Sequence, residues 1–106
     1  MGKLFRKHLL ADSNEVSWSI WEGDDYNVFR ITLKFSTAPS AIENIIVKID
    51  SGSGAAYDCI IDSYDPNGQT DVCLEGYCNI PNGDKLLVTY ANTGSHTISG
   101  VATVGL

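Results

Sequence analysis

One stretch of sequence decides the fold class: Val28-Phe29-Arg30-Ile31-Thr32-Leu33-Lys34-Phe35. Every second residue is a large apolar one, and most of the residues between them are polar or charged. Such period-2 alternation is typical of a β-strand with one buried and one exposed face. The stretch therefore predicts a strand in a sheet that covers a hydrophobic core.

Comparable patterns extend outward from this stretch in both directions. The further predicted strands are residues 16–21, 45–50, 57–62, a short pair at 72–74 and 77–80, 86–91, and 97–104. Within residues 57–62 we expect Tyr57, Cys59 and Ile61 to point inward. The pair at 72–74 and 77–80 is expected to form a hairpin through Glu75-Gly76.

Turn signals separate these segments, as in Asp65-Pro66-Asn67-Gly68 and Pro81-Asn82-Gly83-Asp84. Seven or eight short strands with turns between them are typical of antiparallel sandwiches and barrels. We expect an all-β protein, an antiparallel β-sandwich with jelly-roll-like topology. The 106 residues suit a single domain.

The charge of the chain is uneven. The net charge is -6, yet Lys3, Arg6 and Lys7 lie within the first seven residues. We therefore divide the chain into a basic N-terminal arm, residues 1–14, and a β-sandwich domain, residues 15–106. The arm would lie on the acidic surface of a neighbouring subunit, and Lys3, Phe5, Arg6 and Lys7 are its candidate contacts; the alternative is a solvated tail.

The overall acidity argues against binding of DNA or RNA, which requires clustered Lys and Arg. The N-terminal residues lack the apolar run of a signal peptide, and Arg6 stands where a myristoylation motif needs Ser or Thr. No apolar run approaches the ~20 residues that span a bilayer. We expect a soluble protein without a membrane partner.

The three cysteines are Cys59, Cys73 and Cys78. If Glu75-Gly76 were a two-residue turn, Cys73 would face Cys78 closely enough for a disulfide. An odd number of cysteines without a CxxC spacing fits neither a zinc set nor a disulfide framework. Free thiols are the favoured interpretation, with Cys59 as a small core residue.

Oxygen-bearing side chains gather between residues 62 and 71, namely Asp62, Asp65, Asn67 and Asp71. Their spacing departs from a calcium-binding EF-hand loop, and Asx residues also bond their own turns, which is the favoured interpretation. His8 and His96 have no nucleophile in a recognisable motif. We therefore predict no metal, no cofactor and no enzymatic activity.

One group of aromatic residues stands out: Trp18, Trp21 and Tyr26. Trp18 falls on the apolar face of its strand and is expected in the core. Trp21 and Tyr26 are the candidates for contact with a partner, because Trp and Tyr are favoured at interfaces and can stack on sugar rings.

Several stretches of the chain resemble small structural proteins of tailed bacteriophages. They are Ile31-Thr32-Leu33, Ser36-Thr37-Ala38-Pro39, Glu43-Asn44, Val47-Lys48-Ile49-Asp50-Ser51, Gly54-Ala55-Ala56-Tyr57-Asp58, Ser63-Tyr64-Asp65, Pro81-Asn82-Gly83-Asp84 and Leu87-Val88-Thr89-Tyr90-Ala91-Asn92-Thr93. The resemblance implies a virion component of the head decoration or head–tail accessory type. It further implies synthesis in the bacterial cytoplasm, self-association, and binding to a major capsid, neck or tail protein.

The sequence thus favours a non-enzymatic bacteriophage virion protein that stabilises the particle. The alternative is a carbohydrate-binding β-sandwich module that contacts the host surface, with Trp21 and Tyr26 beside Asp24 and Asp25 as its binding residues.

Overall fold

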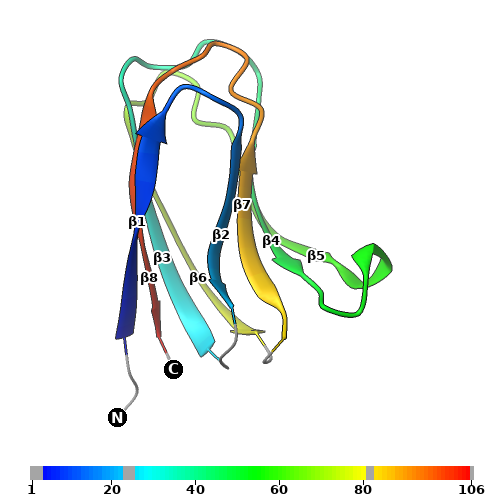
Figure 1. The fold of residues 1–106 in the computed structure, drawn as a ribbon. Coiled ribbons are helices and arrows are strands. Elements are labelled where there is room, and N and C mark those ends of the chain that lie inside the picture. Colours follow the sequence, from blue (N-terminus) through cyan, green and yellow to red (C-terminus); the bar gives the residue numbers. More distant parts are fainter. Residues whose placement is uncertain (1–3, 23–25, 81–82, 106) are drawn as a thin grey trace.

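The computed structural model of the protein describes residues 4–22, 26–80 and 83–105 (Figure 1). Within these ranges, only the course of the backbone is described for residues 4–5, 10–11, 21–22, 26–27 and 78–79. Eight strands and one short 3-10 helix form the described structure. Their bounds are β1 Leu4–Asp12, β2 Val16–Glu22, β3 Tyr26–Phe35, β4 Ile45–Asp50, η1 Ala55–Tyr57, β5 Cys59–Tyr64, β6 Asp71–Ile80, β7 Lys85–Tyr90 and β8 Ile98–Gly105.

The strands form two four-stranded sheets that face each other (Figure 1). One sheet has the order β1-β8-β3-β6 and the other the order β2-β7-β4-β5, and all neighbours are antiparallel. β1 pairs with β8, β2 with β7, β3 with β6 and β4 with β5, so the chain resembles one long hairpin that is rolled up. This nested order is that of a jelly roll, and the predicted fold class is confirmed.

The core lies between the sheets and consists mainly of alternate residues of β2, β3, β4, β6, β7 and β8, with Leu9 from β1, whereas β5 contributes only the partly buried Ile61 and Tyr64. In β3 these are Phe29, Ile31, Leu33 and Phe35, and in β7 they are Leu86, Val88 and Tyr90. Trp18 is partly buried against this cluster, as expected. The period-2 patterns therefore identified the buried faces of the central strands correctly.

The expected hairpin at Glu75-Gly76 is wrong. β6 runs without a turn from Asp71 to Ile80 and pairs along its length with β3, apart from a register shift between Tyr26 and Val28. Gly76 lies opposite Phe29, and a Cβ atom at Gly76 would stand 2.3 Å from the Phe29 ring. Glycine is thus present because an aromatic ring covers the strand there.

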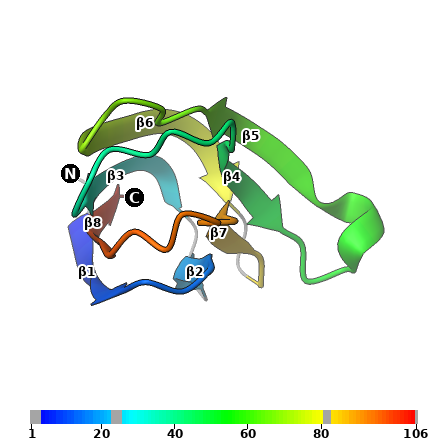
Figure 2. The ribbon, with the colours of Figure 1, turned by 90° about the horizontal axis from the view of Figure 1, so that it is seen from above.

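The expected inward side of residues 57–62 is also wrong in part. Tyr57 belongs to η1 and is 70% exposed, and Cys59 is exposed, whereas Ile61 packs against the core. β5 is an edge strand, and the segment between β4 and β5 projects away from the two sheets (Figure 2). Side chains in a projecting segment have no second sheet to cover them.

The division into an arm and a domain at residue 14 does not hold either. Leu4–Asp12 forms β1, which pairs with β8 in a continuous register from Leu4 to Leu9. Leu9 is buried in the core, and the Lys7 Nζ donates a hydrogen bond of 2.6 Å to the carbonyl oxygen of Ser19 in β2. β1 therefore belongs to one sheet, where its pairing satisfies the backbone groups along β8. The Lys7 hydrogen bond connects it to the other sheet. No helix in the described ranges is long and apolar enough to cross a membrane.

Candidate interaction surface

The outward side of the β1-β8-β3-β6 sheet, here called the outer face, carries Arg6, one of the predicted charged contact residues. Its side chains alternate with those of the core. They are Arg6 and His8 of β1, Ser99, Val101 and Thr103 of β8, Val28, Arg30, Thr32 and Lys34 of β3, and Asp71, Cys73, Glu75 and Tyr77 of β6.

The strand register arranges these side chains in rows across the sheet. One row is Arg6, Thr103, Arg30 and Glu75, and the next is His8, Val101, Thr32 and Cys73. Directly opposed residues of antiparallel neighbours interact through their side chains. The rows therefore define which groups meet on the outer face.

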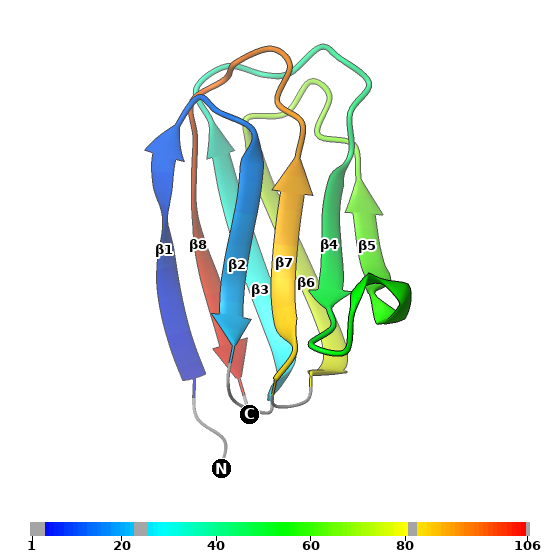
Figure 3. The ribbon, with the colours of Figure 1, turned by 45° about the vertical axis from the view of Figure 1, so that its right-hand side comes forward.

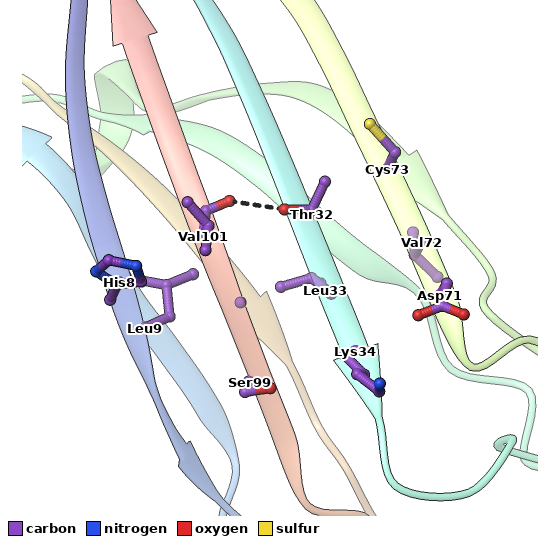
Figure 4. A pocket seen from close by; sticks show the side chains of 11 residues that line it. His8, Leu9, Thr32, Leu33, Lys34, Asp71, Val72, Cys73, Ser99 and Val101 are labelled. Carbon is purple, nitrogen blue, oxygen red and sulfur yellow. Dashed lines mark hydrogen bonds between the residues drawn. The ribbon is translucent and has the colours of Figure 1, made fainter.

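A shallow depression lies on the outer face above β8 (Figure 4). It has a volume of about 480 Å³ and is bordered by His8 on one side and by Thr32, Lys34 and Cys73 on the other. On the core side of β8 beneath the depression, Gly100 lies close to β3. A Cβ atom at Gly100 would stand 2.6 Å from the carbonyl oxygen of Thr32, so glycine is required at this position.

A second depression of about 390 Å³ continues along β8 beside Arg6, Arg30, Thr103 and Glu75. Here the Arg30 Nη2 and the Glu75 Oε2 form an ion pair of 3.0 Å. The hydrogen bond with Glu75, and then the charge of Glu75, raise the pKa of the Arg30 guanidinium. In the described part of the chain, Arg6 and Lys34 have no ion-pair partner.

The loops between β1 and β2, β3 and β4, β5 and β6, and β7 and β8 gather at one end of the sandwich (Figure 3). Asn92 is buried there, with a φ of 54°. Its Nδ2 donates to the carbonyl oxygens of Ser13, Asn14 and His96, and its Oδ1 accepts the N–H of His96. The Asn92 side chain therefore links the β1–β2 loop to the β7–β8 loop and has a structural role at this end of the sandwich.

Two acidic residues of the predicted oxygen-rich stretch, Asp62 and Asp65, accept hydrogen bonds from backbone groups close by in the sequence. The Asp65 Oδ1 accepts the N–H of Asn67 at 3.0 Å, and the Asp62 Oδ1 accepts the N–H of Ser63 at 2.8 Å. The Asp65 bond is the local bond expected of an Asx residue in a turn, whereas Asp62 lies within β5 and bonds the N–H of the next residue. Among the described residues, no three His, Cys, Asp or Glu side chains gather where they could hold a metal ion.

Cys59 and Cys73 are free thiols and both are exposed, so the favoured interpretation of these two cysteines is confirmed. The side chain of Cys78 lies outside the described residues. Because both residues belong to the continuous strand β6, Cys73 and Cys78 are separated by about 17 Å along the chain, too far for a disulfide. The expected placement of Cys59 in the core is wrong.

The predicted contact residues have different outcomes. Arg6 is exposed on the outer face, whereas Lys7 points the other way, toward β2. Lys3 lies outside the described residues. For Phe5, Trp21 and Tyr26 the structure describes only backbone positions, in β1, β2 and β3 respectively, so their contact roles stay predictions.

The sequence interpretation missed one exposed aromatic residue. Tyr77 on β6 is 80% exposed at the edge of the outer face. The alternation of Asp71, Cys73, Glu75 and Tyr77 would have placed it on the outward side, had the strand not been broken at Gly76. Among the side chains that the structure describes, the other large apolar residues that are exposed are Ile42, Tyr57 and Ile60.

The strand order and this surface define a class: an eight-stranded jelly-roll domain with a mixed-charge sheet face that lies between the edge strands β1 and β6. No family model and no curated protein matches the chain. Among solved structures, it is similar to chains in two structures of infectious bursal disease virus. For the Gx strain the TM-score is 0.47 at 14% identity, and for the Gt strain it is 0.46 at 12% identity.

Both similarities cover 100% of this chain, and they cover 32% and 31% of the viral chains. The chain thus spans about a third of the length of these neighbours. TM-scores and identities this low support no statement about function, which has to rest on the chain itself.

Proposed function

We propose that this protein is a non-enzymatic structural component of a virion, and that it binds other virion proteins and stabilises the particle. The observation that carries the proposal is the strand order β1-β8-β3-β6 and β2-β7-β4-β5. Double-sheet jelly rolls of this kind recur in viral capsid domains, and also in lectins and cupins. Because one fold serves many functions, the fold supports the proposal by analogy and needs a second argument.

The sequence also resembles small structural proteins of tailed bacteriophages. The stretches that carry this resemblance fall on several parts of the sandwich, including the centre of β3, most of β4 and most of β7 with the loop that follows it. On this basis we propose the more specific role of a head decoration or head–tail accessory protein. The location would be the virion, after synthesis in the bacterial cytoplasm.

The polar outer face also suits a structural component that packs against other subunits. A sandwich with a polar outer face can pack side by side with other subunits, and opposite charges set the order of packing. The net charge of -6 argues against a nucleic-acid partner. We therefore propose protein partners, namely other copies of the chain and a major capsid, neck or tail protein.

Mass spectrometry of purified particles tests this role directly. We expect the intact protein in many copies per particle. Particles assembled without it should lose their genome at a lower temperature or after a milder osmotic shock, and added protein should restore their stability. Absence of the protein from purified particles would overturn the proposal, and unchanged particle stability would overturn the decoration role.

The carbohydrate-binding alternative depends on Trp21 and Tyr26, whose side chains lie outside the described residues. A glycan array probed with the full chain and with Trp21→Ala examines it. Binding that depends on Trp21 would support the alternative, whereas no binding would remove it.

A further inference from the structure

β1 and β6 are the two open edges of one sheet. β1 pairs only with β8 and β6 only with β3 among the described residues, and the two strands lie at opposite ends of the sheet (Figure 2). β1 has nine residues and β6 has ten. Alternate N–H and C=O groups of an edge strand point away from its neighbour and can pair with another strand.

The directions of the two edges are compatible with each other. Since every neighbouring pair in the sheet is antiparallel, β1 runs opposite to β6. A second copy that is moved sideways across the sheet would therefore bring its β6 antiparallel to β1 of the first copy. Strand addition of this kind continues a sheet through main-chain hydrogen bonds.

The charges of the two edges are opposite. β1 carries Arg6 and Lys7 against the single carboxylate of Asp12, and β6 carries Asp71 and Glu75 without a basic residue. Pairing of β1 with a second β1 would bring like charges together, as would pairing of β6 with a second β6. The pairing of unlike edges brings the net positive charge of β1 next to the net negative charge of β6, so the charges favour this pairing over both symmetric contacts.

The register of the sheet places particular residues opposite each other in such a contact. The row of Arg6, Thr103, Arg30 and Glu75 would continue, so Arg6 would lie next to Glu75 of the following copy. In the adjacent row, His8 would lie next to Cys73 of the following copy. Arg6 lacks an ion-pair partner among the described residues, and Arg6, His8, Cys73 and Glu75 are all exposed.

We propose that the partner of these edges is a second copy of this chain, bound head to tail with β1 against β6. The contact is heterologous, so each copy keeps one free edge, and the assembly closes into a ring or grows as a filament. The inference rests on the edges of one sheet and not on the virion role. A protein that self-associates in this way but is absent from particles would keep this inference and overturn the proposed function.

Cross-linking of the full chain tests the register of the contact. Because Cys59 is also an exposed thiol, all variants carry Cys59→Ser; in His8→Cys, a short bis-maleimide should then join the new thiol to Cys73 of the next copy and produce a ladder of dimers, trimers and larger species. The ladder should be absent in His8→Cys combined with Cys73→Ser. It should also be absent in Lys7→Cys, whose side chain lies on the other side of β1. A reaction that stops at dimers, a ladder that survives Cys73→Ser, or no ladder would each overturn the proposal.

A second measurement needs no new cysteine. Sedimentation of Arg6→Glu and Arg6→Lys, each verified as folded by circular dichroism, compares a reversed charge with a conserved one. We expect the glutamate variant to self-associate at least about tenfold more weakly than the lysine variant, which should match the unmodified protein. Equal association of the two variants, or an unmodified protein that stays monomeric at every concentration, would overturn the head-to-tail contact.

Discussion

At the scale of the residue, buried polar groups connect the loops of this sandwich. Asn92 adopts a left-handed backbone conformation, which Asn tolerates better than most residues. Its amide makes four hydrogen bonds to backbone groups of two loops, at 2.9 to 3.2 Å. A side chain that satisfies several buried backbone groups is hard to replace, because each group left without a partner destabilises the fold.

We expect Asn92→Ala to lower the free energy of unfolding by about 2–4 kcal/mol, because it removes these hydrogen bonds and keeps the left-handed backbone. Urea denaturation measures the change. Asn14→Ala is the matched control, since Asn14 contributes its backbone carbonyl while its side chain is exposed, and it should stay within about 0.5 kcal/mol of the unmodified protein. Similar stabilities of the two variants would contradict this role of Asn92.

Ionisation of Tyr90 makes the free energy of unfolding depend on pH in the alkaline range. Burial, followed by the negative charges of Glu43 and Asp65, raises the pKa of the Tyr90 hydroxyl above its ordinary value of 10.0. The neutral form is therefore favoured in the folded state. Its contribution to stability is fully present below the pKa of an unfolded tyrosine and is lost as the pH rises from there through the folded pKa.

We expect Tyr90→Phe to show a smaller loss of stability above about pH 10 than the unmodified protein, because it removes the buried ionisable group. Thermal unfolding from pH 8 upward would measure this loss. Tyr57→Phe, at an exposed tyrosine, should leave the alkaline profile unchanged. An identical alkaline loss in Tyr90→Phe would exclude Tyr90 as its source.

At the scale of the element, β6 depends on a contact with its neighbour. Gly76 would be the weak point of an isolated strand, since glycine adds backbone freedom and no packing surface. The Phe29 ring of β3 lies over it and occupies the space that a side chain would need. The strand is therefore continuous because of β3 and not because of its own sequence.

Gly76→Ala should destabilise the protein by about 1–3 kcal/mol, because the added methyl group overlaps the Phe29 ring. Chemical denaturation of Gly76→Ala, Phe29→Leu and the double variant measures the coupling. The double variant should be less destabilised than the sum of the two single variants, since leucine leaves room for the methyl group. Cys73→Ala, at an exposed position on the same strand, is the control and should be nearly neutral. Strict additivity would show that the ring does not cover Gly76 in solution.

At the scale of the whole molecule, the rolled hairpin brings the first and the last described residues together. Leu4 pairs with Gly105, and β1 and β8 lie side by side throughout their length (Figure 1). Nearly every strand pairing joins segments that are distant in the sequence. Such pairings form slowly, because the chain loses loop entropy before the contacts are made.

We therefore expect refolding from urea in milliseconds to seconds, as for other proteins dominated by non-local strand pairing. Stopped-flow tryptophan fluorescence measures the rate. Refolding in microseconds would contradict the nested topology, because only local contacts form so fast.

The sequence by itself determined the class of fold and most of the strands. β2, β3, β4, β7 and β8 were predicted within about two residues, because each has one buried face and the alternation of side chains reports that face directly. The turns between them were visible as Gly, Pro, Asn and Asp. For the surface, the sequence identified Arg6 as a candidate contact, and Arg6 is exposed on the outer face.

Only the tertiary structure decided the course of β1, the continuity of β6 and the exposed position of Cys59 and Tyr57. The course of β1 depends on β8, and the continuity of β6 depends on Phe29, both of which are far away in the sequence. Tyr57 and Cys59 are exposed because they lie before and at the start of the edge strand β5, where no opposing strand among the described residues covers them. The row that joins Arg6 to Thr103, Arg30 and Glu75 is likewise a product of strand register. Periodicity reveals which face of a strand is buried, but pairing is decided by the free energy of contacts that close only when the chain is folded.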